Sequence, residues 1–387
     1  MGVKRLTILG STGSVGTQTL DLVAETPDSY QICALVGGRN VERLAAQARR
    51  FRPDITVISD MSLLPALREA VAGTGLAVAA GREAVLEAAS RPADWTMCAI
   101  TGTIGLEPTL ASVRRGGTIA FACKESLVSA GDVFLAEVRK AGATLLPVDS
   151  EHNAVMQAMA DGNRQAIDKI VLTASGGPFL NHSLEEMRGI TREAALRHPI
   201  WSMGAKISID SATMFNKGLE VIEAARLFSL PSDKIEVLVH PQSVIHGMVC
   251  YADGSVLAQL GAPDMRIPIA HALAWPQRLT TQAPRLDLAQ VAKLTFLPPD
   301  EVRFPALRLA REALQAGAGA PAVLNAANEV AVAAFLERRI GFLDIAGIVE
   351  TVMQKLGAPA VTDIGAVLAL DEMARKTASA LAASKAA

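Results

Sequence analysis

Short apolar runs alternate with helical patterns over the first 150 residues of the chain. Segments such as Val41–Arg50 and Ala84–Ala89 carry charge on one side and Ala, Leu or Val on the other. Strands that alternate with helices form a mostly parallel sheet covered by helices on both faces. This part of the chain is therefore predicted to have an α/β fold. The predicted strands are Leu6–Leu9, Ile32–Val36, Ile55–Ile58, Thr96–Ile100, Thr118–Ala122 and Thr144–Pro147.

The remainder of the chain changes character twice. From about Ser150 to Trp275 the alternation continues, with more Gly, Ser, His and Asn. A proline-punctuated stretch from Pro276 to Pro305 follows and predicts a linker with little regular structure. The last 80 or so residues are predicted to be helical, because apolar positions recur at a spacing of three and four. A length of 387 residues favours two or three domains.

Composition excludes several classes of protein. Lys and Arg number 37 against 39 Asp and Glu, a net charge of −2, which excludes a broadly basic nucleic-acid binder. The four cysteines, Cys33, Cys98, Cys123 and Cys250, form no CxxC pair. That usage is typical of a reducing cytosol and argues against a thiolate zinc site. With no signal-peptide pattern and no apolar run of about 18 residues, the chain is predicted to be a soluble cytoplasmic protein.

A glycine-rich segment, Gly10–Gly16, directly follows the first predicted strand and opens a helical pattern from Val15 to Glu25. Its GxxGxxG spacing is a relative of the dinucleotide-binding fingerprint. Glycines let the backbone approach a pyrophosphate, and a helix N-terminus offers free N–H groups and the positive end of its dipole. The alternative is a tight strand–helix turn with no ligand. The strand–turn–helix context favours nucleotide binding.

The residues after the second strand discriminate between coenzymes. An enzyme that uses NAD places an acidic residue there for the ribose 2′-hydroxyl. This chain has Gly37, Gly38, Arg39 and Asn40 instead. A guanidinium suits a 2′-phosphate, so NADP is favoured over NAD. The alternative is that Arg39 is an ordinary solvated arginine.

Two acidic residues, Asp149 and Glu151, lie where a predicted strand ends and a helix begins. Strand C-termini in open α/β sheets face the ligand crevice, and both carboxylates can turn toward one hard cation such as Mg²⁺ or Mn²⁺. The alternative is helix capping, since Asp and Ser are favoured N-cap residues. This segment alone favours capping.

A third acid lies downstream, in the segment Asp210–Glu220. If residues 212–225 are helical, Asn216 and Lys217 lie on the same face as Glu220. Ser211, Asn216 and Lys217 offer a hydroxyl, an amide and a point charge near a helix start, which suits a phosphate. Glu220 would then complete a three-carboxylate metal site. The alternative is a surface Lys–Glu pair.

Two loops between these segments are further candidates. A small-residue loop that starts at Ser175 follows a predicted strand and either holds phosphate oxygens or is only a turn. The second loop, His198–Lys206, contains Trp201 among polar residues and glycine. It is interpreted either as a lid over a ligand or as a segment whose Trp packs between domains. His246 is left out of the site, because a lone His near a strand is more often structural.

These segments together resemble the 1-deoxy-D-xylulose 5-phosphate reductoisomerase family along nearly the whole chain. The matching motifs are GSTGSVG at 10–16, KESLVSAG at 124–131, LLPVDSEHNA at 145–154, SGGPF at 175–179, RHPIWSMG at 197–204, DSATMFNKGLE at 210–220, HPQSVIHGM at 240–248, GSVLAQLGAPDMR at 254–266 and LNAANEVAVAAF at 324–335.

The resemblance implies a V-shaped subunit of a homodimer. Residues 1–149 would form a Rossmann-like NADPH-binding domain. Residues 150–275 would form an α/β catalytic, metal-binding and dimerisation domain with a flexible flap. Residues 276–301 would be a linker, and 302–387 a C-terminal helical bundle.

The resemblance also assigns roles to residues. The metal ligands would be Asp149, Glu151 and Glu220, which with Lys124 form the catalytic set. The substrate would be held by Lys124, Ser150, Glu151 and Glu220 near the metal, by Ser175, His198, Ser211, Asn216 and Lys217 at its phosphate, and by Trp201 and Met203 closing over the reacting centre. NADPH would be lined by Thr12, Gly13, Ser14, Val15, Gly38, Arg39, Asn40, Cys123, Glu125 and Gly204.

Four positions depart from the family pattern. Cys123 stands where Asn is usual and Arg39 where Lys is usual, while Ile200 and Ala205 replace commoner polar and basic residues of the flap. None of the four belongs to the metal or phosphate set. The departures concern cofactor contacts and flap closure.

The implied reaction uses NADPH and Mg²⁺ or Mn²⁺. It rearranges and reduces 1-deoxy-D-xylulose 5-phosphate to 2-C-methyl-D-erythritol 4-phosphate in the non-mevalonate route to isoprenoid precursors. The alternatives are a metal-independent NADP dehydrogenase of a small hydroxy or semialdehyde substrate, and a protein that binds NADPH without catalysis.

Overall fold

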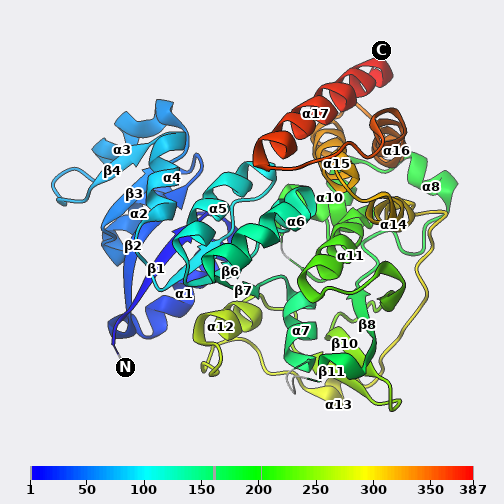
Figure 1. The fold of residues 1–387 in the computed structure, drawn as a ribbon, viewed down its shortest axis with the longest axis horizontal. Helices are drawn as coiled ribbons and strands as arrows, with labels where there is room; N and C mark the ends of the chain where they lie inside the picture. The colour runs from blue at the N-terminus through cyan, green and yellow to red at the C-terminus, as the bar shows by residue number, and fades with distance from the viewer. Residues whose placement is uncertain (1, 160–162, 202, 387) are drawn as a thin grey trace. The chain divides into compact units, whose positions relative to one another are not determined.

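The computed structural model describes residues 2–159, 163–201 and 203–386 (Figure 1). The chain divides into two compact units. Unit 1 holds the residues up to Ser126, Phe134–Asp149 and Asp264–Ala283. Unit 2 holds Leu127–Val133, Ser150–Pro263 and the residues from Pro284 onward.

Unit 1 is built on a parallel sheet with the strand order β4-β3-β2-β1-β5-β6-β7 among the described residues. Every strand pairs in parallel with its neighbours, which confirms the predicted α/β class for this part. The short edge strand β4 has only half-buried side chains and was not predicted. The strands are β1 (Lys4–Leu9), β2 (Tyr30–Gly37), β3 (Ile55–Ile58), β4 (Val78–Ala80), β5 (Trp95–Cys98), β6 (Thr118–Phe121) and β7 (Thr144–Pro147).

The central strands of unit 1 are buried on both faces, because helices connect each strand to the next. The connecting helices are α1 (Ser14–Glu25), α2 (Val41–Phe51), α3 (Leu64–Ala70), α4 (Arg82–Ser90), α5 (Leu106–Arg115) and α6 (Lys124–Ala141). A later helix, α12 (Arg266–Ala274), returns to this unit. Its carbonyl groups accept hydrogen bonds from Lys4 Nζ at Leu273 (2.7 Å) and from Trp95 Nε1 at Ala272 (2.9 Å). Residues 264–283, which the sequence divides between the predicted catalytic domain and linker, thus group with unit 1.

Unit 2 contains a mixed sheet with the strand order β11-β10-β8-β9 among the described residues. Strands β8 (Ile167–Ala174) and β9 (Ile235–Val239) are parallel, whereas β10 (Ile245–Tyr251) is antiparallel to both β8 and β11 (Val256–Leu260). Helix α7 (Ser150–Ala158) packs against β10 and β11. The strands predicted in this part of the chain therefore form a mixed sheet.

Helices of unit 2 share one hydrophobic cluster with that sheet. Residues 212–225 do not form one continuous helix, because α10 ends at Ala212 and α11 begins at Phe215, but Asn216, Lys217 and Glu220 do lie together on α11. Met214 between the two helices takes a left-handed conformation (φ 65°) that breaks the helix. The remaining helices of unit 2 are α8 (Leu184–Arg188), α9 (Arg192–Ala195), α10 (Ala205–Ala212), α11 (Phe215–Phe228), α13 (Leu288–Val291), α14 (Ala306–Ala316), α15 (Ala320–Leu336), α16 (Asp344–Leu356) and α17 (Ile364–Ala386).

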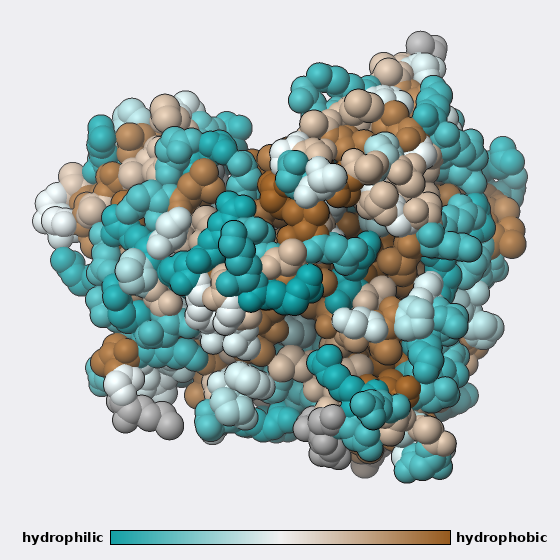
Figure 2. Space-filling model, in the orientation of Figure 1, coloured by the Kyte–Doolittle hydropathy of each residue, from teal (hydrophilic) through white to brown (hydrophobic). Residues whose placement is uncertain are grey.

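No helix among the described residues is long and apolar enough to cross a membrane. The face of the molecule in Figure 2 is largely hydrophilic, with smaller hydrophobic areas. The predicted division into four domains, with a linker at 276–301, stays a prediction.

Candidate active site

The glycine-rich loop of unit 1 is tightly packed where β1 meets α1. Gly10 has a φ of +87°, and a Cβ there would lie 2.4 Å from the carbonyl oxygen of Ala99. A Cβ on Gly16 would lie 2.3 Å from the carbonyl oxygen of Gly10. Both positions therefore require glycine. Gly13 has ordinary space, since the nearest atom to its Cβ would be 3.4 Å away.

The N-terminus of α1 is suited to an anion. Gly13 is the N-cap residue, no side chain caps it, and the first turn carries no acidic residue. Such a terminus presents free N–H groups and the positive end of the helix dipole. Two side chains of α2 bind the backbone of this loop. Arg43 donates to the carbonyl of Thr12 (3.0 Å), and Gln47 donates to the carbonyl of Ser11 (2.8 Å). The sequence did not single out Arg43 or Gln47, since only the packing of α2 against the loop brings them there.

The segment after β2 is exposed. Nothing lies within 4 Å of a Cβ placed on Gly38, and the Arg39 side chain is 81% exposed. Arg39 pairs with Asp60 at 3.5 Å, a separation and exposure at which an ion pair contributes little to stability. Asn40 caps α2 by accepting from the backbone N–H of Arg43 (2.9 Å). The role of Arg39 as a 2′-phosphate ligand stays a prediction.

The start of α6 carries three of the predicted site residues. Cys123 is fully buried, its Sγ lies 3.0 Å from Ser126 Oγ, and burial holds the pKa of the thiol well above its usual value. Lys124 and Glu125 are also buried, and the Lys124 ammonium pairs with the Asp149 carboxylate. Cys123 is therefore an uncharged thiol packed inside unit 1.

Helices α7 and α11 bring acidic and basic groups together in unit 2. The Lys217 ammonium on α11 lies 2.8 Å from Glu151 Oε1 on α7 and also bonds Glu220 on its own helix. Asn216 donates to Glu220, and the Ser150 hydroxyl donates to Glu151. The side chains of Lys217 and Glu220 are 3% and 0% exposed, so the interpretation of this pair as a surface ion pair is wrong.

Lys217 is charged at neutral pH. Burial has the largest single effect and lowers its pKa, but the carboxylates of Glu151 and Glu220 more than offset it. The pKa of Lys217 therefore lies above its ordinary value. One ammonium thus faces two carboxylates in a site with little access to water.

Asp149 precedes α7 by one residue, so the chain itself places it beside Glu151. One oxygen from each of Asp149, Glu151 and Glu220 can be chosen so that the three lie within 4.8 Å of one another. Convergent carboxylate oxygens are the ligands that Mg²⁺ and Mn²⁺ prefer. The group of acids expected from the sequence is thus a candidate metal centre.

A second candidate group contains Asp149, His152 and Glu223. The His152 Nε2 lies 2.8 Å from Glu223 Oε2, and the two side chains are 0% and 1% exposed. His152 also contacts Phe228 edge-on. This group is more deeply buried than the first. It links α7 to α11 one helical turn beyond Glu220.

The loop after β8 holds a Ser–His pair. Ser175 Oγ lies 3.0 Å from His198 Nε2, and the backbone N–H of Trp201 donates to His198 Nδ1 (2.9 Å). Because Nδ1 accepts, the proton of the neutral ring is on Nε2, which donates to Ser175. Burial lowers the pKa of His198, which favours this neutral form. The predicted phosphate residues Ser175 and His198 are therefore in direct contact.

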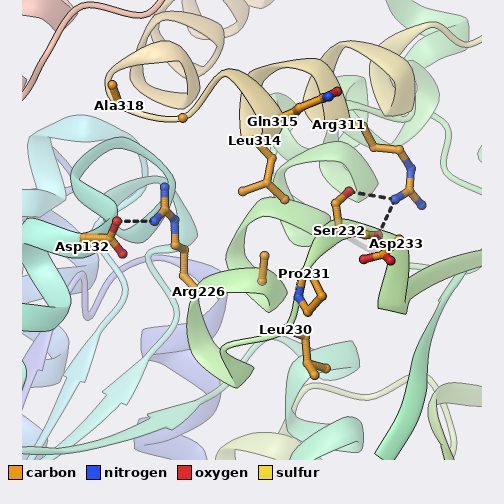
Figure 3. A pocket seen from close by; sticks show the side chains of 12 residues that line it. Asp132, Arg226, Leu230, Pro231, Ser232, Asp233, Arg311, Leu314, Gln315 and Ala318 are labelled. Carbon is orange, nitrogen blue, oxygen red and sulfur yellow. Dashed lines mark hydrogen bonds and ion pairs between the residues drawn. The ribbon is translucent and has the colours of Figure 1, made fainter.

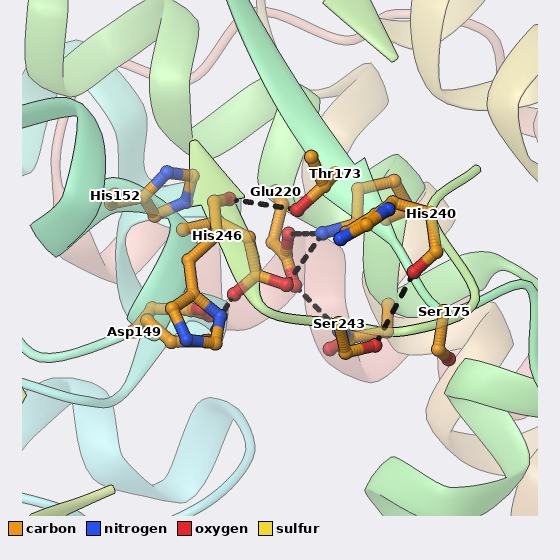
Figure 4. A network of polar contacts seen from close by, with 12 residues as sticks. Asp149, His152, Thr173, Ser175, Glu220, His240, Ser243 and His246 are labelled. Atoms are coloured by element: carbon orange, nitrogen blue, oxygen red, sulfur yellow. Dashed lines mark hydrogen bonds and ion pairs between the residues drawn. The ribbon is translucent and has the colours of Figure 1, made fainter. Parts of the chain in front are cut away.

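The loop that contains Trp201, which is the predicted flap, contacts His246, a residue that the sequence analysis left out of the site. Trp201 lies against His246, with ring centroids 6.0 Å apart. Burial lowers the pKa of His246, while the charge of Glu151 acts in the opposite sense. Thr173 fixes the start of β10 by donating to the carbonyls of Ile245 (2.6 Å) and His246 (3.0 Å) (Figure 4). Nothing in the sequence around His246 indicates that this residue lies beside Trp201.

The other predicted residues of unit 2 lie on or next to α10. Ser211 is half-buried on that helix, Gly204 is its N-cap, and Met203 precedes the cap. Gly204 was predicted to line the coenzyme, whose loop belongs to unit 1, and that role stays a prediction. The flexibility of the flap also stays a prediction.

A cavity of about 770 Å³ lies elsewhere in unit 2, between the ends of α11 and α14 (Figure 3). Its two arginines are already paired. Arg226 binds Asp132 at 2.6 Å, and Arg311 donates to the backbone oxygen and hydroxyl of Ser232 at 2.8 and 3.0 Å. The cavity does not include the carboxylate cluster of α7 and α11.

Comparison with known proteins places the chain in a family. The model of 1-deoxy-D-xylulose 5-phosphate reductoisomerase matches residues 6–131, and that of its C-terminal domain matches 145–228. The model described as the DXP reductoisomerase C-terminal domain matches residues 260–377. The chain belongs to the 1-deoxy-D-xylulose 5-phosphate reductoisomerase family.

Full-length relatives agree with the family models. The reductoisomerase of Rhodospirillum centenum is 57% identical over 382 residues, which cover 99% of this chain and 95% of that protein. That of Gluconobacter oxydans is 58% identical over 378 residues, which cover 97% of this chain and 93% of that protein. The family predicted from the sequence motifs is thereby confirmed.

Solved reductoisomerase structures share the fold. The enzyme of Zymomonas mobilis, solved in complex with NADPH, is 52% identical with a TM-score of 0.92 and covers 99% of each chain. A DOX-P reductoisomerase solved with NADPH, fosmidomycin and magnesium is 44% identical with a TM-score of 0.93 and covers 98% of each chain. The predicted fold class is confirmed, with its parallel N-terminal sheet, central sheet domain and C-terminal helices.

Proposed function

We propose that the protein converts 1-deoxy-D-xylulose 5-phosphate to 2-C-methyl-D-erythritol 4-phosphate with NADPH and a divalent metal ion, in the non-mevalonate isoprenoid pathway. The observation that carries the proposal is the convergence of Asp149, Glu151 and Glu220 in a chain whose relatives are reductoisomerases over their full length. A dehydrogenase that only transfers hydride needs no such group of acids.

The three carboxylates fit a hard divalent cation such as Mg²⁺ or Mn²⁺. Their oxygens converge, Glu220 is fully buried, and the pairing of Glu151 and Glu220 with the Lys217 ammonium supports a place where positive charge is stabilised. A bound cation supplies Lewis-acid stabilisation for negative charge on substrate oxygens. Lys124 and Ser150, beside Asp149 and Glu151, would orient those oxygens.

The phosphate of the substrate would bind to a set of hydroxyl, imidazole, amide and ammonium groups. The Ser175–His198 contact supports this role, because both side chains can donate to one anion. Binding energy from a phosphate remote from the reacting carbons positions the substrate for reaction. The proposed set is Ser175, His198, Ser211, Asn216 and Lys217.

NADPH would bind with its pyrophosphate at the N-terminus of α1. The uncapped first turn and the tight packing of Gly10 and Gly16 support this placement. Arg39 would bind the 2′-phosphate. Trp201 and Met203 would exclude water from the reacting centre. The remaining proposed coenzyme contacts are Thr12, Gly13, Ser14, Val15, Gly38, Asn40, Cys123, Glu125 and Gly204.

The experiment is NADPH oxidation, followed by absorbance, with 1-deoxy-D-xylulose 5-phosphate in the presence of Mg²⁺ or Mn²⁺ and then of EDTA. We expect turnover with metal, loss with EDTA, recovery on adding Mg²⁺ back, and a product identified as 2-C-methyl-D-erythritol 4-phosphate. Glu220→Gln should lose activity while still binding NADPH. Turnover that survives EDTA would favour the metal-independent dehydrogenase instead. NADPH binding with no turnover would favour a non-catalytic binding protein.

We further propose that the protein is a homodimer formed through unit 2. Strand β11 is an edge of its sheet, and Val256, Leu257 and Leu260 on it are 54%, 43% and 37% exposed. An exposed apolar edge strand is a template for pairing with a second chain. Light scattering should give the mass of a dimer, and Leu257→Lys should shift it toward that of a monomer. A monomeric wild-type protein would contradict the proposal.

A cytoplasmic location is proposed as well. Cys33, Cys98, Cys123 and Cys250 are all free thiols, which a reducing compartment preserves. Cell fractionation should find the protein with cytoplasmic markers.

A further inference from the structure

A buried polar contact joins α10 to α15 within unit 2. Asp210 lies in the last turn of α10, and its side chain is 2% exposed. One carboxylate oxygen accepts from Asn328 Nδ2 on α15 at 2.8 Å, and the other lies 2.7 Å from Lys206 Nζ. Asn328 is fully buried. A charge-assisted hydrogen bond thus connects two elements that are 118 residues apart in the sequence.

The orientation of the Asn328 amide is determined by this contact. Turning the amide over would place its carbonyl oxygen against the Asp210 carboxylate, which is repulsive. Among the described residues, the Oδ1 of Asn328 has no hydrogen-bond partner. The hydrogen bond to Asp210 is therefore the polar contact that orients the Asn328 side chain.

Asp210 lies on α10 shortly before the turn that joins α10 to α11, and both helices carry proposed phosphate ligands. Ser211 is the next residue, and the Thr213 hydroxyl donates to the carbonyl oxygens of Ile209 (2.8 Å) and Asp210 (3.3 Å). Met214 then takes its left-handed conformation, and α11 begins at Phe215. The position of Asp210 therefore determines where Ser211 and the start of α11 lie.

The opposite side of this turn is in close contact with the loop after β8. A Cβ on Gly177 would lie 2.9 Å from the carbonyl oxygen of Ser211. The backbone N–H of Gly177 donates to Ser175 Oγ at 3.2 Å. The turn at Ser211 is thus held between the Ser175 loop on one side and, through Asp210, α15 on the other.

We propose that Asn328 is a positioning residue for the phosphate of the substrate. Through its hydrogen bond to Asp210 it fixes Ser211 and the turn that leads to Asn216 and Lys217. In this role Asn328 acts through Asp210 and does not itself bind the phosphate. The inference rests on the proposed function, since it takes the phosphate set from there.

The test compares Asn328→Ala with Asn325→Ala. Asn325 is a matched control, because it is also fully buried on α15 but donates to Ser129 and Glu329 rather than to Asp210. In Asn328→Ala we expect KM for 1-deoxy-D-xylulose 5-phosphate and the inhibition constant of inorganic phosphate to rise together, each about tenfold. The kcat at saturation and the KM for NADPH should change less than about twofold. Asn325→Ala should lower stability without changing the two phosphate-dependent constants.

Equal effects of the two variants on the phosphate-dependent constants would overturn the inference, because they would show a merely structural role. If Asn328→Ala does not fold, Asp210→Leu keeps roughly the volume and removes the acceptor to which Asn328 donates. It should raise the same two constants, and unchanged constants would overturn the inference.

Failure of the proposed function is distinguishable in the same series. Wild-type protein without turnover would reject the reaction. The inference would then be tested by the rise in melting temperature that inorganic phosphate gives to the wild type. A smaller rise in Asn328→Ala than in Asn325→Ala supports it, and equal rises overturn it.

Discussion

Substituting Gly16 tests the packing of the nucleotide loop. A Cβ at Gly16 would lie 2.3 Å from the carbonyl oxygen of Gly10 and 2.5 Å from the Cα of Ser11. Both are backbone atoms, and the loop cannot easily yield, because the N–H groups of Gly10 and Ser11 donate to the Val36 carbonyl at 2.9 and 2.8 Å. Forcing an extra methyl into such a contact costs about 1–3 kcal/mol. We therefore expect Gly16→Ala to destabilise unit 1 by that amount.

Gly13→Ala is the matched control from the same motif. Its Cβ would meet its nearest neighbour at 3.4 Å, and Gly13 has a φ of −76°, which alanine adopts without strain. The expected cost is below about 1 kcal/mol, from the weaker preference of alanine for an N-cap.

The assay is urea unfolding of both variants without coenzyme, followed by titration with NADPH. Gly16→Ala should show the lower midpoint of unfolding and bind NADPH about tenfold more weakly, because moving α1 by a fraction of an ångström misplaces its N–H groups. Equal midpoints for the two variants would refute the reasoning, since the loop would then accommodate a Cβ that the structure excludes.

Three further results are expected. Arg39→Ala should lower kcat/KM for NADPH about tenfold with little change for NADH, and parallel losses for both coenzymes would contradict the 2′-phosphate role. Burial lowers the pKa of His271 to about 4, so the unfolded chain binds the proton more readily and stability falls as the pH drops from 6.5 toward 4. The loss should be about 1–2 kcal/mol after allowing for solvent screening, and His271→Gln should remove it in urea titrations at both pH values. Glu223→Ala should destabilise the protein by about 1–3 kcal/mol, since it removes a buried polar neighbour of His152, and an unchanged melting temperature would disprove this.

The parallel sheet was predictable because its strands are apolar runs separated by helical patterns. The edge strand β4 was not, since three half-buried residues carry almost no periodic signal. The sequence also did not predict that α12 belongs to unit 1, because this depends on contacts with Lys4 and Trp95, which are far away in the sequence. Met214 has no sequence signal of a break, as a methionine rarely adopts a positive φ.

The spacing of residues along the chain predicted contacts within one helix of the candidate site, but not contacts between different helices. The contact of Glu220 with Lys217 follows from their spacing of three, whereas the contact of Lys217 with Glu151 joins two helices 66 residues apart. The bonds of Arg43 and Gln47 to the glycine loop are of the same kind. Motifs locate reactive residues, and tertiary packing decides which of them meet.

Burial changes the meaning of the Lys217–Glu220 pair. On a surface, a pair at this spacing contributes less than about 1 kcal/mol and would carry no functional weight. Here Lys217 and Glu220 are almost fully buried, and Glu151 beside them is 17% exposed. Removing each such ion from water costs several kcal/mol, and apolar residues of similar volume often give equal or greater stability. Stability therefore does not account for three charges at this place. The proposed site for a divalent cation and an anionic substrate accounts for them, because such a site needs charged groups in position before either ligand binds.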